Sequence, residues 1–496
     1  MVLGSGARVP SGLARCRNRG ESAWSVFPVR WRPGATEYRR ASVWALPIIR
    51  SGRERSDAAR CLPCINGDSK GHPHLLRACY HSAPFRRQVI EVSESPVRGI
   101  PPAGRFALAA AFCSAVGQTF FIGLFGSDFR AEFGLSETML GTFYGLATLA
   151  SGLIMFWLGA IADHMLMRRA IVLTMLMLAA GAAMIGFSPN LAWLVIGLFL
   201  VRLAGQGLSG HLAVVAAGRY AHRRRGRAVA MATYGFILGE ASFPPLVAFA
   251  LGWLDWRDVW LCAAVGLLLA AVPALWWQAR SLVGSGPDTR TESEPVPALI
   301  SRRKLFVHGS FLRVLMVVLV PPFVVTALFL HQGALAQRLE WTLASVASGF
   351  VLFAALQGIS AFTGGRLIDR FSARALLRFH LLPAGFGVLG LGLAPPDVAM
   401  WMMFAGLGLT AGLNGVISGA VWVELFGTRQ LGMIRGVYAA LMVLSTAAGP
   451  VVLGLLLDWQ VSLLVMGLGL LAWVVVVPAV LVPGVQGFQS GPERLN

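Results

Sequence analysis

Two ionisable residues of opposite charge, Arg202 and Glu240, stand in the middle of long apolar stretches of the sequence. An arginine at the centre of a membrane-spanning helix costs ~2.5–3.5 kcal/mol on insertion scales, so such residues usually serve a function. Arg202 lies about eleven residues into its stretch, and Glu240 about twelve residues into the next stretch, counted from the opposite side. We therefore expect the two side chains to reach a similar depth in the membrane.

Two interpretations of this pair remain open on the sequence alone. In the first, Arg202 and Glu240 neutralise each other and hold two helices together. In the second, they line a central cavity, where Glu240 takes up a proton and Arg202 binds an anionic substrate. Burial favours the protonated form of a carboxyl group and a nearby cation favours the ionised form, so both arrangements are chemically reasonable.

Other polar side chains interrupt the apolar stretches, and we include them as candidates for substrate binding or coupling. The set consists of Gln118, Gln206, His331, Gln357 and Asn414. Gln206 lies one helical turn after Arg202. His331 follows the helix-breaking pair Pro321-Pro322, which predicts a gating bend, although a single histidine in such a place is more often structural.

The composition shows which kind of protein holds these residues. Of 496 residues, 56% are hydrophobic and 13% are charged, and the mean hydropathy is +0.66. Soluble domains carry about 25% charged residues. This chain has too few charges to cover a folded soluble body of its size, which predicts an all-α polytopic membrane protein.

Apolar stretches of about 20 residues, each long enough to cross a ~30 Å hydrocarbon core, recur from Phe106 onward. We predict twelve spans, near residues 106–127, 138–162, 170–187, 191–217, 228–250, 258–277, 311–334, 343–365, 375–394, 398–423, 433–457 and 461–484. With the amino terminus inside, the even-numbered connections and the tail carry 20 Lys/Arg and the odd-numbered connections carry 3. This bias predicts that both termini are cytoplasmic. We expect a multi-pass protein of the bacterial inner membrane.

The chain repeats itself across its two halves. Gly159, Asp163 and Arg168 recur 206 positions later as Gly365, Asp369 and Arg374. Parallel repeats of six spans are typical of secondary transporters. We therefore divide the chain into five parts: a basic, disordered extension (1–104), an amino-terminal six-helix bundle (105–277), a cytoplasmic linker (278–310), a carboxy-terminal six-helix bundle (311–485) and a cytoplasmic tail (486–496).

The segment from Gly159 to Arg169 resembles the motif Gly-x-Leu-x-Asp-Arg-x-Gly-Arg-Arg, which joins the second and third helices in the major facilitator superfamily. His164 replaces the first Arg of the motif, and Leu166 and Met167 replace its second Gly-Arg. The second copy keeps Asp369-Arg370 but has Ser372 at the position of the Gly. The resemblance covers residues 105–485 and implies the superfamily fold of two six-helix bundles.

In this superfamily the Asp of the motif holds the opposite half of the protein and locks the outward-open state. By this resemblance Asp163 pairs near Arg435, and Asp369 near Arg227. The implied conformational latch comprises Gly159, Asp163, Arg168, Gly365, Asp369, Arg370, Arg374 and Arg435. The alternative is an exposed ion pair that contributes ~0–1 kcal/mol.

Arg202-x-x-x-Gln206-Gly207 resembles the superfamily's fourth-helix motif Arg-x-x-Gln-Gly, with the Gln one place late. A mid-span arginine suits a carboxylate, as in the oxalate- and monocarboxylate-type members. The fifth span lacks the Gly-Pro of the drug/proton antiporters, but the eighth span holds only Gln357 where monocarboxylate carriers have an Asp/Arg pair. We expect proton-coupled uptake of a small organic anion. The alternatives are a proton-driven efflux antiporter and a sensor of similar fold that transports nothing.

The sequence gives little reason to expect an enzyme. Gly207-Leu208-Ser209-Gly210-His211 resembles the nucleophile motif of rhomboid proteases, but His211 is too close to Ser209 to face it from another helix. No phosphate-binding Gly-rich loop of the Walker type occurs, so transport is not expected to use ATP. We expect a monomer in the lipid bilayer that needs no cofactor and binds no nucleic acid.

The first 105 residues hold 18 of the 42 Lys/Arg and no run of 18 apolar residues. They are a basic tail attracted to anionic lipid, a transit peptide, or a segment that is not translated because synthesis starts near Val92 or Val97. A group of potential zinc ligands lies in this extension: Cys61, Cys64, His72, His74, Cys79 and His81. Their spacing fits no familiar zinc site, so we expect no metal there.

Overall fold

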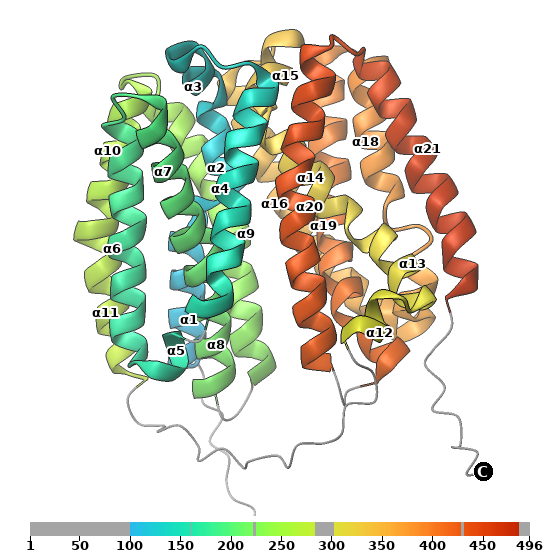
Figure 1. Ribbon diagram of the computed structural model, residues 1–496, viewed down its shortest axis with the longest axis horizontal. Helices are drawn as coiled ribbons and strands as arrows, with labels where there is room; N and C mark the ends of the chain where they lie inside the picture. The colour runs from blue at the N-terminus through green and yellow to red at the C-terminus, as the bar shows by residue number, and fades with distance from the viewer. Residues whose placement is uncertain (1–99, 160, 222–224, 283–301, 428–430, 486–496) are drawn as a thin grey trace, which may run out of the picture. The chain divides into compact units, whose positions relative to one another are not determined.

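The computed structural model describes residues 100–485 except 160, 222–224, 283–301 and 428–430, and the side chains of Ala162, Asp163, Arg225 and Arg302 are also outside its description. The described residues form helices and no strands (Figure 1). Most of the basic extension, with its potential zinc ligands, lies outside the described residues. So do most of the linker and the tail from residue 486.

The first half of the chain forms six spans, three of which change their helical type part-way. The first span is α1 (Pro102–Cys113), η1 (Ser114–Gly117), α2 (Thr119–Ile122), η2 (Gly123–Phe125) and α3 (Gly126–Phe133). The next two are α4 (Glu137–Leu158) and, after the short α5 (Ile161–His164), α6 (Met167–Gly186). The fourth is α7 (Leu191–Val201), the π-helical η3 (Arg202–Ser209) and α8 (Gly210–Tyr220). The fifth is α9 (Arg225–Ala250), and the sixth is α10 (Trp256–Gly266), η4 (Leu267–Ala271) and α11 (Val272–Arg280).

The second half repeats this order. After α12 (Arg302–Phe306), the seventh span is α13 (Gly309–Val318), α14 (Val320–Leu330) and α15 (Gln332–Arg338). The eighth is α16 (Leu343–Phe371), and the ninth is α18 (Leu382–Leu393), preceded by α17 (Ala373–Leu376). The last three are α19 (Pro396–Phe426), α20 (Leu431–Asp458) and α21 (Leu463–Leu481), which ends in η5 (Val482–Gly484).

The predicted spans agree with these helices. Ten helical segments of the described chain are long and apolar enough to cross a membrane. The fifth and ninth spans, α9 and α18, fall outside that group. In α9 the apolar sequence is interrupted by Glu240 and the Pro244-Pro245 pair, and the regular helix of α18 has only 12 residues. With these two helices the described part of the chain has twelve spans, and the predicted all-α membrane fold is confirmed.

Side-chain caps fix where several helices begin. A hydroxyl, amide or carboxylate oxygen accepts the N–H of the first helical turn, which otherwise has no partner. The capping residues are Ser136 for α4, Asn190 for α7, Asp255 for α10, Thr342 for α16 and Ser462 for α21. All five precede even-numbered spans, so they share one end of the helices.

The two ends of the helices differ in charge, and we name each end by its charge. The acidic face is the end that holds Asp128, Glu132, Glu137, Asp255, Glu340 and Asp458, near α3 and α15 at the top of Figure 1. The basic face is the opposite end, which holds Arg168, Arg219, Arg227, Arg374, Arg378 and Arg435. The bias found in the sequence therefore separates the two ends of one helical body.

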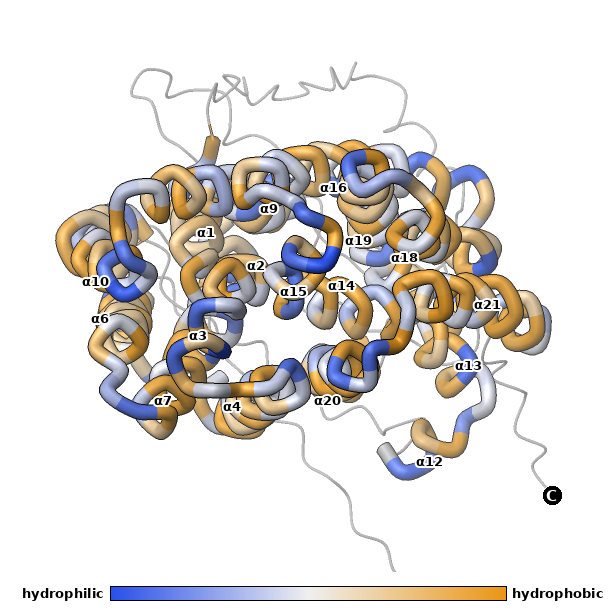
Figure 2. The backbone as a smooth tube through the Cα atoms, turned by 90° about the horizontal axis from the view of Figure 1, so that it is seen from above, coloured by the Kyte–Doolittle hydropathy of each residue, from blue (hydrophilic) through white to orange (hydrophobic). Residues whose placement is uncertain are grey.

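Helices from the two halves pack together in a symmetric way. Helix α4 packs against α20, and α9 packs against α16, and these pairs lie side by side in Figure 2. The second span thus meets the eleventh, and the fifth meets the eighth. Two six-span repeats that face each other are expected to form two equivalent helix pairs, because the second span corresponds to the eighth and the fifth to the eleventh.

The acidic face is closed because glycines let backbones from the two halves touch. A Cβ atom on Gly141 would lie 2.5 Å from the carbonyl oxygen of Pro450, and one on Gly454 would lie 2.6 Å from the carbonyl oxygen of Glu137. Small residues at such contacts allow close helix approach. Toward the basic face, a Cβ atom would meet no described atom within 4 Å at Gly218, Gly226, Gly415, Gly419, Gly432 or Gly436. In the described residues, the two halves are therefore in backbone contact at the acidic face, and these six glycines make no such contact.

Candidate functional site

The first span is broken at its middle, beside the fourth span. Gln118 has an extended backbone (φ −89°, ψ 154°) between η1 and α2. Gly117, directly before it, touches the fourth span, because a Cβ atom on Gly205 would lie 2.7 Å from the Gly117 Cα atom. Breaks of this kind leave carbonyl groups without an intrahelical partner, and in transporters they occur at binding sites.

Arg202 fills the space next to this break. Its side chain is 1% exposed, and it opens the π-helical segment η3. Its Nη1 donates to the carbonyl oxygen of Gly117 (3.2 Å), and its Nε donates to Oγ1 of Thr148 in α4 (3.1 Å). The guanidinium carbon also lies 4.9 Å from the ring centroid of Tyr144, a cation–π distance. Arg202 therefore joins the broken first span to the second.

One part of the Arg202 guanidinium has no partner. Its Nη2 is buried and makes no hydrogen bond within the described residues. No carboxylate pairs with Arg202 there, so its charge meets only a hydroxyl, a carbonyl and an aromatic ring. A buried charge of this kind is costly unless its donors are satisfied.

Glu240 lies in the fifth span, next to a glycine that contacts the first span. The neighbouring Gly239 packs on the first span, since a Cβ atom there would lie 3.1 Å from Cβ of Ala115. Oε2 of Glu240 is buried and has no hydrogen-bond partner in the described part of the chain. No ion pair or hydrogen bond joins Arg202 and Glu240 within the described residues.

The remaining polar candidates are spread over both halves. Nε2 of Gln118 donates to Oγ of Ser114 (3.4 Å), and Gln206 is half-buried in η3. In the second half, Oε1 of Gln357 in α16 and Oδ1 of Asn414 in α19 are buried without a partner among the described residues. None of these four side chains is hydrogen-bonded to Arg202 or Glu240 in the described structure.

The prediction from sequence did not include Tyr144 and Thr148, which complete the surroundings of Arg202. Both are in α4, one helical turn apart, and Tyr144 shares a hydrogen bond of 2.6 Å with Thr119. Their spacing could have been noticed in the sequence, because a polar pair at i and i+4 in an apolar span lies on one face of the helix. The spacing does not show which residue or helix packs against that face.

His331 lies away from this site, in the closed contact at the acidic face. It is 1% exposed and sits between α14 and α15. Its Nδ1 is 2.8 Å from Oε2 of Glu137 in α4, and its Nε2 is 2.8 Å from the carbonyl oxygen of Pro450 in α20. The helix is interrupted at Leu319, between α13 and α14, and the gating bend at Pro321-Pro322 stays a prediction.

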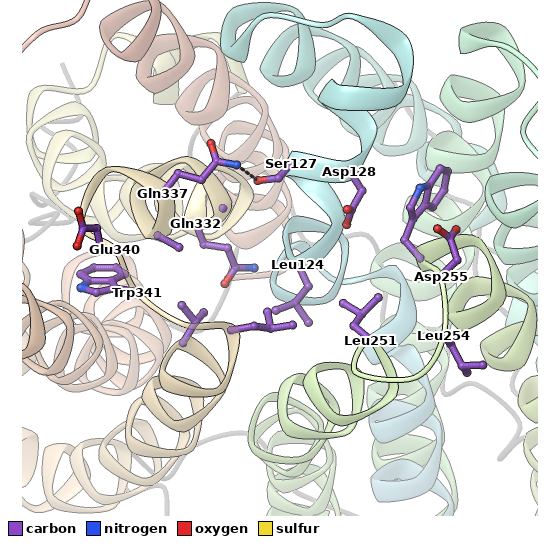
Figure 3. A pocket seen from close by; sticks show the side chains of 15 residues that line it. Leu124, Ser127, Asp128, Leu251, Leu254, Asp255, Gln332, Gln337, Glu340 and Trp341 are labelled. Carbon is purple, nitrogen blue, oxygen red and sulfur yellow. Dashed lines mark hydrogen bonds between the residues drawn. The ribbon is translucent and has the colours of Figure 1, made fainter.

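A pocket of about 630 Å³ opens at the acidic face. Figure 3 shows Ser127 and Asp128 of the first span facing Gln332 and Gln337 of the seventh, with Asp255 and Glu340 at the sides. Among the described residues, its lining holds three carboxylates and no Lys or Arg. An anion would therefore find no cation in this lining while the acidic face is closed.

The Ser209 and His211 side chains make separate structural contacts. The Ser209 hydroxyl donates to the carbonyl oxygen of Ala110 (2.8 Å), and Nε2 of His211 lies 2.9 Å from the carbonyl oxygen of Gly159. The Ser209 bond joins the fourth span to the first, and the His211 bond joins it to the end of the second. In the described part of the chain, no group of three His, Cys, Asp or Glu side chains could hold a metal ion.

Sequence comparison identifies the family. A family model described as Major Facilitator Superfamily matches residues 107–347 and 323–493. The chain belongs to the major facilitator superfamily. It is therefore a multi-pass integral membrane protein of a transporter family, as its fold and apolar helices also indicate. A search of curated protein sequences finds no match.

Solved structures of superfamily members share this fold. A bacterial homologue of the human lysosomal transporter Spinster, inward-facing and unoccupied, superposes with a TM-score of 0.58 at 16% identity, over 78% of this chain and 95% of that one. Its inward-facing, occupied form gives 0.56 at 16% identity and the same coverage. A D-xylose–proton symporter gives 0.59 at 14% identity, over 76% of this chain and 95% of that one. These low identities establish the fold only.

Part of the superfamily latch can be followed in the described residues. Asp369 and Arg435 are exposed, and neither forms an ion pair within the described residues. The side chain of Asp163 lies outside the described residues. Arg168 and Arg280 instead lie over the ring of Trp276, at 5.8 Å and 3.5 Å from its centroid. The latch is expected to lock the outward-open state, whereas the acidic face is closed here, so the latch stays a prediction.

Proposed function

We propose that this protein carries a small organic anion, such as a carboxylate, into the cell together with a proton, by alternating access. The observation that supports this most is the buried Nη2 of Arg202, which has no partner in the described structure. A hydrogen bond to a charged group contributes ~1.5–3 kcal/mol. An anion that supplies the missing acceptor would therefore gain about 10- to 150-fold in affinity over a neutral analogue.

Glu240 supports the coupling to a proton. Its buried Oε2 has no donor in the described residues, and the adjacent Gly239 packs against η1 of the first span. In our proposal Glu240 carries the proton when the cavity is loaded and loses it toward the basic face. Gln118, Gln206, Gln357 and Asn414 then complete the polar lining of the substrate path.

The proposed orientation places the basic face in the cytoplasm, together with both termini, because Lys and Arg are retained on that side. The membrane is the bacterial inner membrane, and the working unit is a monomer. The bundles at 105–277 and 311–485 rock about the contacts of α4 with α20 and of α9 with α16. Transport then needs no enzymatic step and no cofactor.

The test is flux into proteoliposomes of the purified full chain, with a panel of carboxylates and an imposed pH gradient. We expect saturable uptake that is driven by an inwardly directed proton gradient. If no compound is transported, the interpretation as a sensor is favoured. If substrate leaves the vesicles while protons enter, the protein is an antiporter. The Glu240→Gln variant should still exchange substrate but lose its response to the pH gradient.

Two variants separate a binding role of Arg202 from its structural one. Thr148→Val removes one hydrogen bond of Arg202 but keeps its charge, so it should alter the KM by less than about tenfold. Arg202→Gln removes the charge and should raise the KM by about 10- to 150-fold if the anion binds there. Equal effects of the two substitutions, in variants that are folded by size-exclusion chromatography, would exclude Arg202 as the anion site.

A second function has one observation in its favour. The pocket at the acidic face is lined by Asp128, Asp255 and Glu340, with no cation among its described lining residues. Carboxylates at that face would suit the release of a cationic compound better than the capture of an anion. Proton-driven efflux of drugs or metabolites is therefore the alternative, and the direction of flux in the same proteoliposomes distinguishes it.

A further inference from the structure

The closed acidic face contains a hydrogen-bonded bridge between the two halves of the protein. His331, from the second half, reaches Glu137 at the start of α4 in the first half. Its other ring nitrogen faces the carbonyl oxygen of Pro450, in its own half. Both nitrogen–oxygen distances are 2.8 Å, and the Glu137 side chain is 8% exposed. The bridge is therefore short and almost dry.

The geometry of the bridge between His331 and Glu137 requires an additional proton. A backbone carbonyl can only accept, so the hydrogen between Nε2 of His331 and Pro450 belongs to Nε2. A neutral imidazole with its hydrogen there presents a lone pair at Nδ1, and an ionised Glu137 also presents lone pairs. Two lone pairs at 2.8 Å repel each other, so a further hydrogen must lie between Nδ1 and Oε2. The closed bridge holds one proton more than a neutral histidine and a carboxylate.

The charged groups around the bridge do not replace this proton. Arg130 of α3 forms an ion pair with the other oxygen, Oε1, of Glu137. Asp458 at the end of α20 accepts the backbone N–H groups of Glu137 (3.1 Å) and Thr138 (2.9 Å). Arg338 of α15 donates to the carbonyl oxygen of Leu457 (2.7 Å). None of these three charged side chains lies between the imidazole and the carboxylate.

We propose that His331 and Glu137 form a proton-binding site between the two halves, which takes up one proton when the acidic face closes. Opening of that face separates the two residues and removes the need for the shared proton. Because the closed state then binds one proton more than the open state, acid favours closure, by at most about tenfold in the equilibrium per pH unit. This site is separate from Glu240 and does not depend on the identity of the substrate.

The experiment measures closure of the acidic face without substrate. Fluorophores on Pro189→Cys and Val398→Cys, both exposed and in different halves, report the distance across that face in the full chain in lipid nanodiscs. The native cysteines are replaced beforehand. The fraction of closed molecules is followed over a range from about pH 5 to about pH 9, which spans the ordinary titration of histidine. We expect it to rise as the pH falls.

Two substitutions supply the missing hydrogen without a proton. In Glu137→Gln the amide N–H can donate to Nδ1 of a neutral His331, and in His331→Gln an amide N–H can donate to Glu137. Both variants should close the acidic face with no dependence on pH. Asp458→Asn is the matched control, because Asp458 belongs to the same contact and binds the start of α4, but has no hydrogen bond to the imidazole. It should weaken closure equally at every pH and keep the pH dependence.

The outcomes separate this inference from the proposed function. A pH dependence that persists in both Glu137→Gln and His331→Gln, or that disappears in Glu240→Gln or Asp458→Asn instead, would overturn the proton site. A flat wild-type response would do the same. Failure of carboxylate uptake in proteoliposomes would leave this result untouched, because the distance measurement uses no substrate.

Discussion

Replacing Gly141 by alanine should open the acidic face. A Cβ atom at this position would lie 2.5 Å from the carbonyl oxygen of Pro450 and 2.8 Å from its carbonyl carbon, whereas ordinary contacts begin near 3.4 Å. Helices α4 and α20 would have to separate by about 0.9 Å, the difference between these contact distances, or the closed state would carry the strain. Overpacking of this kind costs ~1–3 kcal/mol.

This cost falls on only one conformation. When the acidic face opens, α4 and α20 separate at this end, so the added methyl group meets nothing there. The gain in helix propensity from Gly to Ala, about 1 kcal/mol, applies to both conformations and cancels between them. The closed fraction relative to the open one should therefore fall by about 5- to 150-fold.

The assay is the same distance measurement between the two halves at the acidic face. Gly469→Ala is the matched control, because Gly469 lies in α21 and a Cβ atom added there would meet no described atom within 4 Å. It should gain the same helix propensity and leave the distance distribution unchanged. A Gly141→Ala protein that stays as closed as the wild type, or a control that opens equally, would refute the contact argument.

Three further substitutions test other parts of the molecule. Asp163→Asn and Asp369→Asn should each lower the rate of transport without reducing the amount of protein in the membrane, as measured by uptake and by quantitative immunoblotting; unchanged uptake would exclude the latch. Tyr144→Phe keeps the ring beside Arg202 but loses the hydrogen bond to Thr119, so the free energy of unfolding should fall by about 1 kcal/mol, as followed by thermal denaturation. A change in substrate KM in this variant larger than that in Arg202→Gln would contradict the role given to the arginine.

Much of the fold could be predicted because it depends on local properties of the sequence. Apolar length determines the spans, and the repetition of Gly159 and Asp163 at Gly365 and Asp369 gives the two halves. The interruption of the first span could not be predicted in this way. Ser114–Gln118 carries no proline, and the break depends on the contact of Gly117 with Gly205, which are far apart in the sequence. No window of sequence contains both residues.

The candidate site was predicted less completely, for the same reason. Arg202 and Glu240 are conspicuous as charges in apolar spans, but the choice between an ion pair and two separate groups depends on side-chain direction. In this conformation the arginine turns to Thr148 and Gly117 instead. The pairing of His331 with Glu137 could not be predicted from the sequence either. Glu137 lies at the start of a helix, where an acidic residue is already explained as a favourable charge at the amino end.

The two faces of the protein use different chemistry to close, and this difference has a consequence for the transport cycle. The acidic face closes through glycine-mediated backbone contacts and one shared proton, at His331 and Glu137. The basic face is expected to close through the latch, in which Asp163 and Asp369 hold the opposite half of the protein. A carrier needs both states within a few kcal/mol of each other. Under our proposal, loss of the shared proton at His331 and Glu137 destabilises the closed acidic face, so deprotonation there shifts the equilibrium toward the outward-open state. Without substrate, the protein should therefore favour the inward-open state in acid. This preference should decline as the pH rises.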